Sequence, residues 1–160
     1  EVMALDKIKN LNIHLIIAGE FYDEKSKYLK KMKSLNLNNR IILHDHYIPN
    51  EDVKNYFCAS DIVVQPYLTA TQSGVSMVAF NFNKPVLLTN VGGLSEYVVN
   101  NSDGYLVDPN KEKIASALED FYINGKEQMF SDAIKCKKSN YTWASLTKKF
   151  DSLYYELQDD

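Results

Sequence analysis

The chain is poor in residues that several kinds of site require. Its 160 residues include only two cysteines, Cys58 and Cys136, and a single arginine, Arg40. Two cysteines are too few for a disulfide framework, and their spacing is not that of metal ligands. With one arginine, the paired guanidinium clamps of many phosphate enzymes are either absent or supplied from elsewhere.

Long apolar runs and strong charge are also missing. No stretch approaches the ~18 residues needed to cross a bilayer, and no signal peptide is visible, so no transmembrane segment is expected. The formal net charge of −3 gives no reason to expect a nucleic-acid partner. These features favour a cytoplasmic protein. Because the sequence does not begin with Met, we expect it to be a fragment of a longer protein.

What is present fits one soluble α/β domain over residues 1–160. Hydrophobic residues make up 45% of the chain, which is enough for a buried core. Strand and helix patterns alternate, as in a doubly wound, Rossmann-like parallel sheet. Strands are expected at about 12–18, 40–44, 61–65, 85–89 and 104–107. Helices are expected at about 23–35 and 51–59 and throughout the C-terminal third.

The most informative stretch runs from Ser60 to Glu96. A short apolar run ends at Pro66, small polar residues follow from Thr69 to Gly74, and a helix is expected to begin at about Ser73. The first turn of a helix has unpaired N–H groups and the positive end of the helix dipole, which together favour phosphate binding. The loop therefore predicts a phosphate site. The alternative is a simple capped helix start in which Gly74 allows close packing.

Three pieces of this stretch resemble the C-terminal, nucleotide-binding half of GT-B glycosyltransferases of the retaining family four. They are Ala-Ser-Asp-Ile-Val-Val-Gln-Pro at 59–66, Lys-Pro-Val at 84–86 and Val-Gly-Gly-Leu-Ser-Glu at 91–96. The similarity extends on both sides and covers nearly the whole chain. It implies half of a GT-B fold, with a nucleoside diphosphate sugar as donor and no metal or other cofactor.

The resemblance also implies a set of donor-binding residues. They fall in the loops that follow successive strands: Gly19, Glu20, Tyr47, Thr71, Gln72, Ser73, Gly74, Val75 and Gly93. The acceptor, a glycan or a lipid-linked sugar, would be held by an N-terminal domain outside this sequence. The resemblance leaves open a peripheral association of the parent protein with the inner face of a membrane.

The chain departs from the family pattern at two places. Ala70 and Val78 stand where the family usually carries two glutamates, so no catalytic residue is assigned. The central first strand and its Lys-Gly helix start are also missing, since residues 1–10 correspond to the end of the first crossover helix. Either the sequence begins inside the domain, or the strands near 12–18 and 61–65 pair directly.

Other prominent residues have structural interpretations. His44 and His46 have the spacing of two metal ligands on one side of a strand, but no third ligand is evident. We expect His14 to be a hydrogen-bonded core histidine. Trp143, Tyr154 and Tyr155 are interpreted as helix-packing residues.

The predicted function is donor binding in a glycosyltransferase of the hexosyltransferase type, in which this chain alone is inactive. Two alternatives remain open. The missing carboxylates favour a non-catalytic nucleotide-binding module, and the same architecture also serves sugar-nucleotide epimerases.

Overall fold

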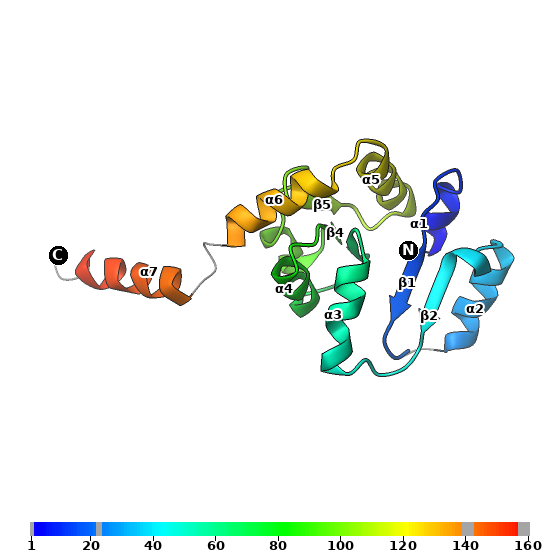
Figure 1. Ribbon diagram of the computed structural model, residues 1–160, viewed down its shortest axis with the longest axis horizontal. Coiled ribbons are helices and arrows are strands. Elements are labelled where there is room, and N and C mark those ends of the chain that lie inside the picture. The colour runs from blue at the N-terminus through cyan, green and yellow to red at the C-terminus, as the bar shows by residue number, and fades with distance from the viewer. Residues whose placement is uncertain (1, 22–23, 139–142, 157–160) are drawn as a thin grey trace.

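The computed structural model describes residues 2–21, 24–138 and 143–156, and it shows short strands alternating with helices (Figure 1). The strands are β1 (Leu15–Ala18), β2 (Ile41–His44), β3 (Val63–Gln65), β4 (Val86–Thr89) and β5 (Gly104–Val107). The helices are α1 (Val2–Lys7), α2 (Lys25–Ser34), α3 (Asn50–Ala59), α4 (Gly74–Asn81), α5 (Lys111–Ile123), α6 (Glu127–Lys138) and α7 (Trp143–Glu156). The described residues also include the 3-10 turns η1 (Asn38–Arg40) and η2 (Gly92–Glu96). The predicted α/β class with parallel strands is confirmed.

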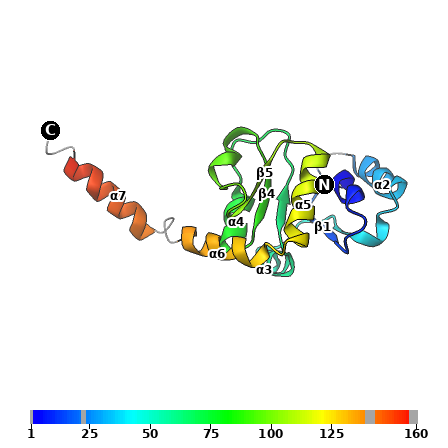
Figure 2. The ribbon, with the colours of Figure 1, turned by 90° about the horizontal axis from the view of Figure 1, so that it is seen from above.

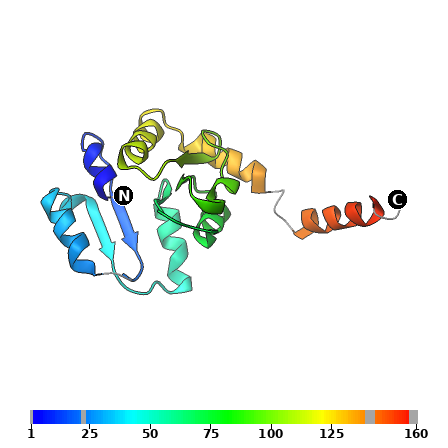
Figure 3. The ribbon, with the colours of Figure 1, turned by 180° about the vertical axis from the view of Figure 1, so that it is seen from behind.

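The five strands form two separate parallel sets. β1 pairs with β2, and β3, β4 and β5 pair in that order. α3 carries the chain back from the end of β2 to the start of β3, so β1 and β3 run in the same direction (Figure 3). Since β1 and β3 belong to different sheets, the direct pairing of these two strands, one of the two alternatives drawn from the sequence, is wrong.

Helices cover the strands from both sides. Alternate residues of β4 enter different hydrophobic clusters: Leu87 joins α1, α2 and α5, whereas Val86 and Leu88 join α4. Figure 2 shows α5 and α4 on opposite sides of β4 and β5. A continuous apolar run such as β4, with all four residues buried, is typical of a parallel strand covered on both faces.

Polar residues fix the starts of two helices. The side chain of Ser73 caps α4 by accepting from the Ser76 N–H, and Asn110 caps α5 in the same way. At α3, the backbone of Pro49 takes the place of a capping side chain. The carbonyl of Pro49 accepts from the N–H groups of Asp52 (2.9 Å) and Val53 (3.2 Å), so Asn50 is already the first helical residue.

The final helix is not packed as its sequence predicts. Figures 1 and 3 show α7 standing apart from the other described elements. Leu146, Phe150, Tyr154 and Tyr155 on this helix are 42–66% exposed, so the packing role assigned to the two tyrosines is wrong because no described element covers them. The side chain of Trp143 lies outside the described part of the structure. None of the described helices has the length and apolar character of a membrane span.

Candidate functional site

Two loops meet at the carboxyl ends of β3 and β4. The Gly93 N–H donates to the carbonyl of Thr71 at 3.2 Å, which joins the turn after β4 to the loop after β3. Gly92 has a φ of +52°, and a Cβ added there would overlap the carbonyl oxygen of Ala70. Only glycine combines that left-handed backbone with so close an approach. The Gly-Gly turn therefore positions the loop that leads into α4.

Buried polar side chains at the end of β3 and the start of α4 fix the same loop. Gln65, at the end of β3, is 3% exposed, and its Nε2 donates to Ser76 Oγ at 3.2 Å. The hydroxyl of Ser73 donates to Gln65 Oε1 and accepts from the Ser76 N–H at 3.2 Å. β3 and the first turn of α4 are thus connected through one glutamine. Since these groups are paired and buried, the start of α4 is held in one position.

The first two amides of α4 point away from this network. Within the part of the chain that the structure describes, the N–H groups of Gly74 and Val75 find no acceptor, whereas that of Ser76 is capped. Gly74 is exposed, and a Cβ added there would meet no atom within 4 Å. Two donors at the positive end of a helix are therefore open to a ligand. Open N–H groups at a helix start favour anions, and phosphate binding at the start of α4 stays a prediction.

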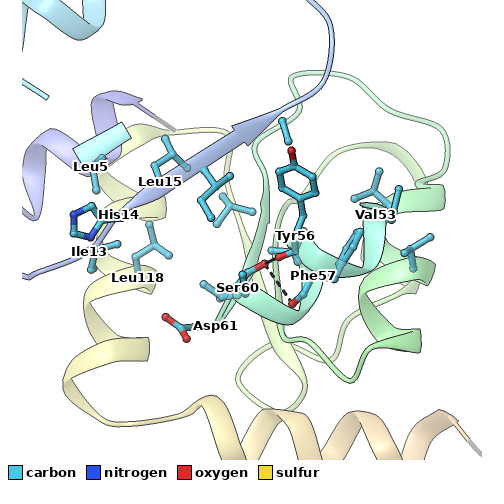
Figure 4. Close-up of a pocket in the computed structure, with 18 of the residues that line it drawn as sticks. Leu5, Ile13, His14, Leu15, Val53, Tyr56, Phe57, Ser60, Asp61 and Leu118 are labelled. Carbon is cyan, nitrogen blue, oxygen red and sulfur yellow. Dashed lines mark hydrogen bonds between the residues drawn. The ribbon is translucent and has the colours of Figure 1, made fainter. Parts of the chain in front are cut away.

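A groove of about 830 Å³ runs beside this helix, between β1 and β3. Its walls come from both strand edges and from helices on either side (Figure 4). Leu5 of α1 and Leu118 of α5 line one side, while Tyr56 and Phe57 of α3 line the other. From α4 come Gly74, Val75 and Val78. The open amides therefore lie along the wall of an extended and mainly apolar cleft.

Loops at the ends of β1 and β2 stand on the other side of the groove. Gly19, with a φ of +128°, continues the β1–β2 pairing by donating to His44 O at 3.0 Å, and Glu20 is exposed beside it. Tyr47, after β2, is 64% exposed. Each of these residues is available to a ligand that lies across the strand ends.

The β2 end is fixed by its own polar contacts. His44 Nδ1 lies 2.7 Å from the Tyr56 hydroxyl, and the His44 and His46 rings stack with centroids 6.0 Å apart. Lys25 pairs with Asp45, and this hydrogen bond lowers the pKa of the Asp45 carboxyl. Among the described residues, no group of three His, Cys, Asp or Glu side chains is placed to hold a metal. His44 is therefore a hydrogen-bonded partner of Tyr56.

The structure brings only part of the predicted donor site together. Thr71, Ser73, Gly74, Val75 and Gly93 form one unit around the start of α4. Gln72 lies in the same loop and is exposed. Among the described residues, no hydrogen bond connects Gly19, Glu20 or Tyr47 to this unit. Their roles in donor binding stay predictions.

Two residues depart from the sequence analysis. His14 precedes β1, is exposed and lines the groove (Figure 4). Its assignment to the core is therefore wrong, because its side chain faces the groove.

Gln65 was not predicted as part of the site. A single polar residue after the apolar run Ile62–Val64 was the available signal, since a buried strand rarely carries an amide without a partner.

Comparison with known proteins identifies the family. Residues 1–137 match the family model described as Glycosyl transferases group 1. The chain belongs to the group 1 glycosyl transferases. It is 31% identical over 130 residues to the D-inositol 3-phosphate glycosyltransferase of Corynebacterium diphtheriae, covering 79% of this chain and 30% of that protein. This chain spans between 22% and 40% of the length of the curated relatives it matches.

Solved structures share the fold of this group 1 glycosyl transferase chain. The C-terminal domain of a group 1 glycosyl transferase from Francisella tularensis superposes with a TM-score of 0.79 at 21% identity, covering 89% of this chain and 77% of that domain. The complex of Anabaena HepE with UDP-glucose superposes with a TM-score of 0.76 at 16% identity, covering 97% of this chain and 44% of HepE. The predicted fold, the C-terminal half of a GT-B glycosyltransferase, is confirmed.

Proposed function

We propose that this chain binds the sugar-nucleotide donor of a retaining glycosyltransferase, which moves a glycosyl group to an acceptor hydroxyl. The observation that carries the proposal is the pair of unoccupied amides at Gly74 and Val75, held beside the Gly92–Gly93 turn. In open α/β sheets, ligands bind outside the carboxyl ends of the strands, where this pair lies. Family membership supplies the reaction class.

The start of α4 suits the diphosphate of such a donor. Negative charge grows on the diphosphate as the glycosyl group leaves, so fixed N–H dipoles stabilise the transition state more than the ground state. Because Ser73 and Gln65 already hold these dipoles in place, they need little reorganisation during the reaction. The N–H groups of α4 therefore hold the diphosphate leaving group.

We propose a uridine diphosphate sugar as the donor. Anabaena HepE, which shares the fold, has been solved with UDP and glucose and with UDP-glucose. In this assignment the exposed ring and backbone of Tyr47 face the base, and Gly19 lines the donor pocket. Glu20, exposed at the end of β1, is available to hydroxyl groups of the donor.

The acceptor, a glycan or a lipid-linked sugar, is assigned to another part of the full-length protein. Relatives are two to five times longer than the matched region, which leaves room for a second domain. Because the reaction takes place between two domains, the 160-residue chain binds donor without transferring it. Its dissociation constant for a nucleoside diphosphate is on the order of 1 mM. Binding is this weak because each dipole contact contributes only about 1 kcal/mol.

A non-catalytic nucleotide-binding module is the second candidate. The family resemblance expects glutamates at Ala70 and Val78, and Val78 lines the groove beside α4. At position 78, where the family usually presents a carboxylate, this chain presents an apolar side chain to the groove. That favours binding without turnover.

Calorimetric titration of the full-length protein with UDP, GDP and UMP tests donor binding. UDP should bind at least about tenfold more tightly than UMP, since the β-phosphate adds charge-assisted bonds at α4. Equal affinities for UDP and UMP would overturn the phosphate assignment. Incubation with labelled UDP-sugars then separates the candidates: transfer to an acceptor supports the transferase, whereas binding with neither transfer nor hydrolysis supports the module.

A further inference from the structure

Two lysines in the last turn of α6 bind the ends of the two elements that begin at the joined loops after β3 and β4. Lys137 Nζ donates to the carbonyl of Tyr97, the residue that follows η2, at 2.6 Å. Lys138 Nζ donates to the carbonyl of Asn81, the last residue of α4, at 2.7 Å. The starts of α4 and η2 therefore lie at the joined loops, and their ends are both held by one turn of α6.

Lys137 is fixed in this position by a buried carboxylate. Its ammonium donates to Asp103 Oδ2 at 2.7 Å, and the Asp103 side chain is only 3% exposed. Asp103 Oδ1 accepts from the Val99 N–H at 2.7 Å. A buried carboxylate that loses its charged partner is strongly unfavourable, so the ammonium group stays where Asp103 needs it.

Apolar side chains join the same three elements. Phe80 of α4, Leu94 of η2 and Ile134 of α6 belong to one hydrophobic cluster, and each is at most 8% exposed. Lys137 Nζ also lies 5.6 Å from the centroid of the Phe80 ring, which is a cation–π distance. α6 thus contacts α4 and η2 through one surface that is apolar at Ile134 and cationic at Lys137.

The two lysines lie where helices favour a cation. The last carbonyls of a helix lack partners within the helix and carry the negative end of its dipole, and an ammonium group there is stabilising. α4 has eight residues and η2 has five, so the held end of each is close to its start. Close-packed interiors transmit small displacements. A shift at the ends of α4 and η2 therefore reaches the loops where they begin.

We propose that Lys137 and Lys138 are positioning residues, which set the spacing between the start of α4 and the Gly92–Gly93 turn. That a donor diphosphate lies at these starts rests on the proposed function. Neither lysine touches the donor in this assignment, because each binds the opposite end of its element. The bond from the Gly93 N–H to Thr71 O reports on the spacing, since it joins the two loops.

Residue-resolved hydrogen exchange of the Gly93 amide tests the positioning without a ligand. In the full-length protein, Lys137→Met should speed this exchange at least about tenfold. Lys126→Met is the matched control. Lys126 is 22% exposed and pairs with Asp120 at 2.6 Å, but among the described residues it bonds to neither α4 nor η2, so Gly93 exchange should not change. An unchanged rate in Lys137→Met, or an equal increase in both variants, would overturn the proposal.

Calorimetric titration of the full-length protein with UDP measures the consequence for the donor. The dissociation constant of Lys137→Met should rise at least about tenfold over that of the parent, whereas Lys126→Met should bind UDP as the parent does. Lys137→Arg keeps a cation with several donors and should stay within about threefold of the parent. Parent-like affinity in Lys137→Met, or equal losses in the methionine and arginine variants, would overturn the proposal. If the parent itself does not bind UDP, the proposed function fails, and the exchange comparison still decides the positioning.

Lys138→Met tests the α4 contact without leaving a buried charge unpaired. Lys138 Nζ donates to Asn81 O and, at 3.3 Å, to Asn83 Oδ1, neither of which is charged, so the variant should fold. Gly93 exchange and the UDP dissociation constant should each rise at least about threefold. Lys135→Met, which removes only an exposed pair with Asp132, should change neither. Equal behaviour of the two variants would overturn the role of Lys138, and this comparison decides the proposal if Lys137→Met does not fold.

Discussion

The backbone N–H of Gly93 donates to the carbonyl of Thr71 at 3.2 Å, and this bond joins the turns that follow β4 and β3. Two loops separated by more than twenty residues therefore behave as one unit. The open amides of α4 take their position from this unit. A change at Gly92 should thus shift the loop that positions these amides.

Gly92→Ala tests the close approach of the two turns. The new methyl group would overlap Ala70 O, and the φ of +52° adds strain. We expect a loss of about 2 to 4 kcal/mol in the free energy of unfolding, measured by urea denaturation. Gly125→Ala is the control, because its φ is +57° but nothing lies within 4 Å, so only about 1 kcal/mol should be lost. Equal losses would show that the contact with Ala70 does not matter.

Gln65→Leu tests the buried link between β3 and α4. The substitution leaves the hydroxyls of Ser73 and Ser76 without their amide partner, at a cost of about 1 to 3 kcal/mol. Adding Ser76→Ala should recover part of that loss, since one unpaired hydroxyl is removed. Urea melts of Gln65→Leu, Ser76→Ala and the double variant measure the three losses. Full additivity of the two losses would contradict the proposed network.

Much of the fold could be predicted from local sequence signals. The apolar runs gave β3 and β4 to within two residues, because a parallel strand buried on both faces needs a continuous apolar run. Small polar residues and glycine predicted the start of α4 at Ser73 and Gly74, since capping is a local interaction. The family resemblance, carried by residues 59–96, gave the architecture and the reaction class.

What could not be predicted depends on contacts between distant segments. The network around Gln65 needs β3 and α4 to be placed first, and a lone polar residue does not reveal its partner. The exposure of Tyr154 and Tyr155 is a similar case, because a sequence pattern shows which face of a helix should be covered but not whether another element covers it. The groove exists only because β1 and β3 remain unpaired.

Asp120 should give the domain a pH-dependent contribution to stability. Hydrogen bonds from Lys126 and Tyr105 lower the pKa of Asp120 to about 2. A carboxyl with a depressed folded-state pKa stabilises above its unfolded value of ~3.9, and this contribution is lost as the pH falls through ~2. The carboxylate is 34% exposed, so we discount its contribution to about 1 kcal/mol.

Urea melts of Asp120→Asn between pH 7 and pH 2 measure this contribution. The variant should be less stable than the parent at pH 7, and the difference should shrink below pH 4. Asp132→Asn is the control, since Asp132 pairs with Lys135 at the surface and its loss should have no measurable effect. A difference that stays constant down to pH 2 would exclude the carboxylate charge as the cause.

Gly74→Val should weaken donor binding in the full-length protein more than it weakens the fold. The added side chain covers the open amide but enters free space, so the free energy of unfolding should change by less than about 1 kcal/mol. The dissociation constant for UDP should rise at least about tenfold. Met77→Val, on the exposed side of the same helix, should leave UDP affinity unchanged. Equal UDP affinities in the two variants would show that α4 does not hold the phosphates.

Val78→Glu tests whether α4 presents this position to the groove. Val78 is half-buried and lines the groove, so in the 160-residue chain a carboxylate there stays hydrated and should cost less than about 1 kcal/mol. The neighbouring Ala79 is fully buried, and Ala79→Glu should lose several kcal/mol because it buries an unpaired charge. Urea denaturation of the two variants side by side measures the contrast. If Val78→Glu collapses the fold as Ala79→Glu does, position 78 faces the core, and it cannot be the place where the family's carboxylate meets the donor.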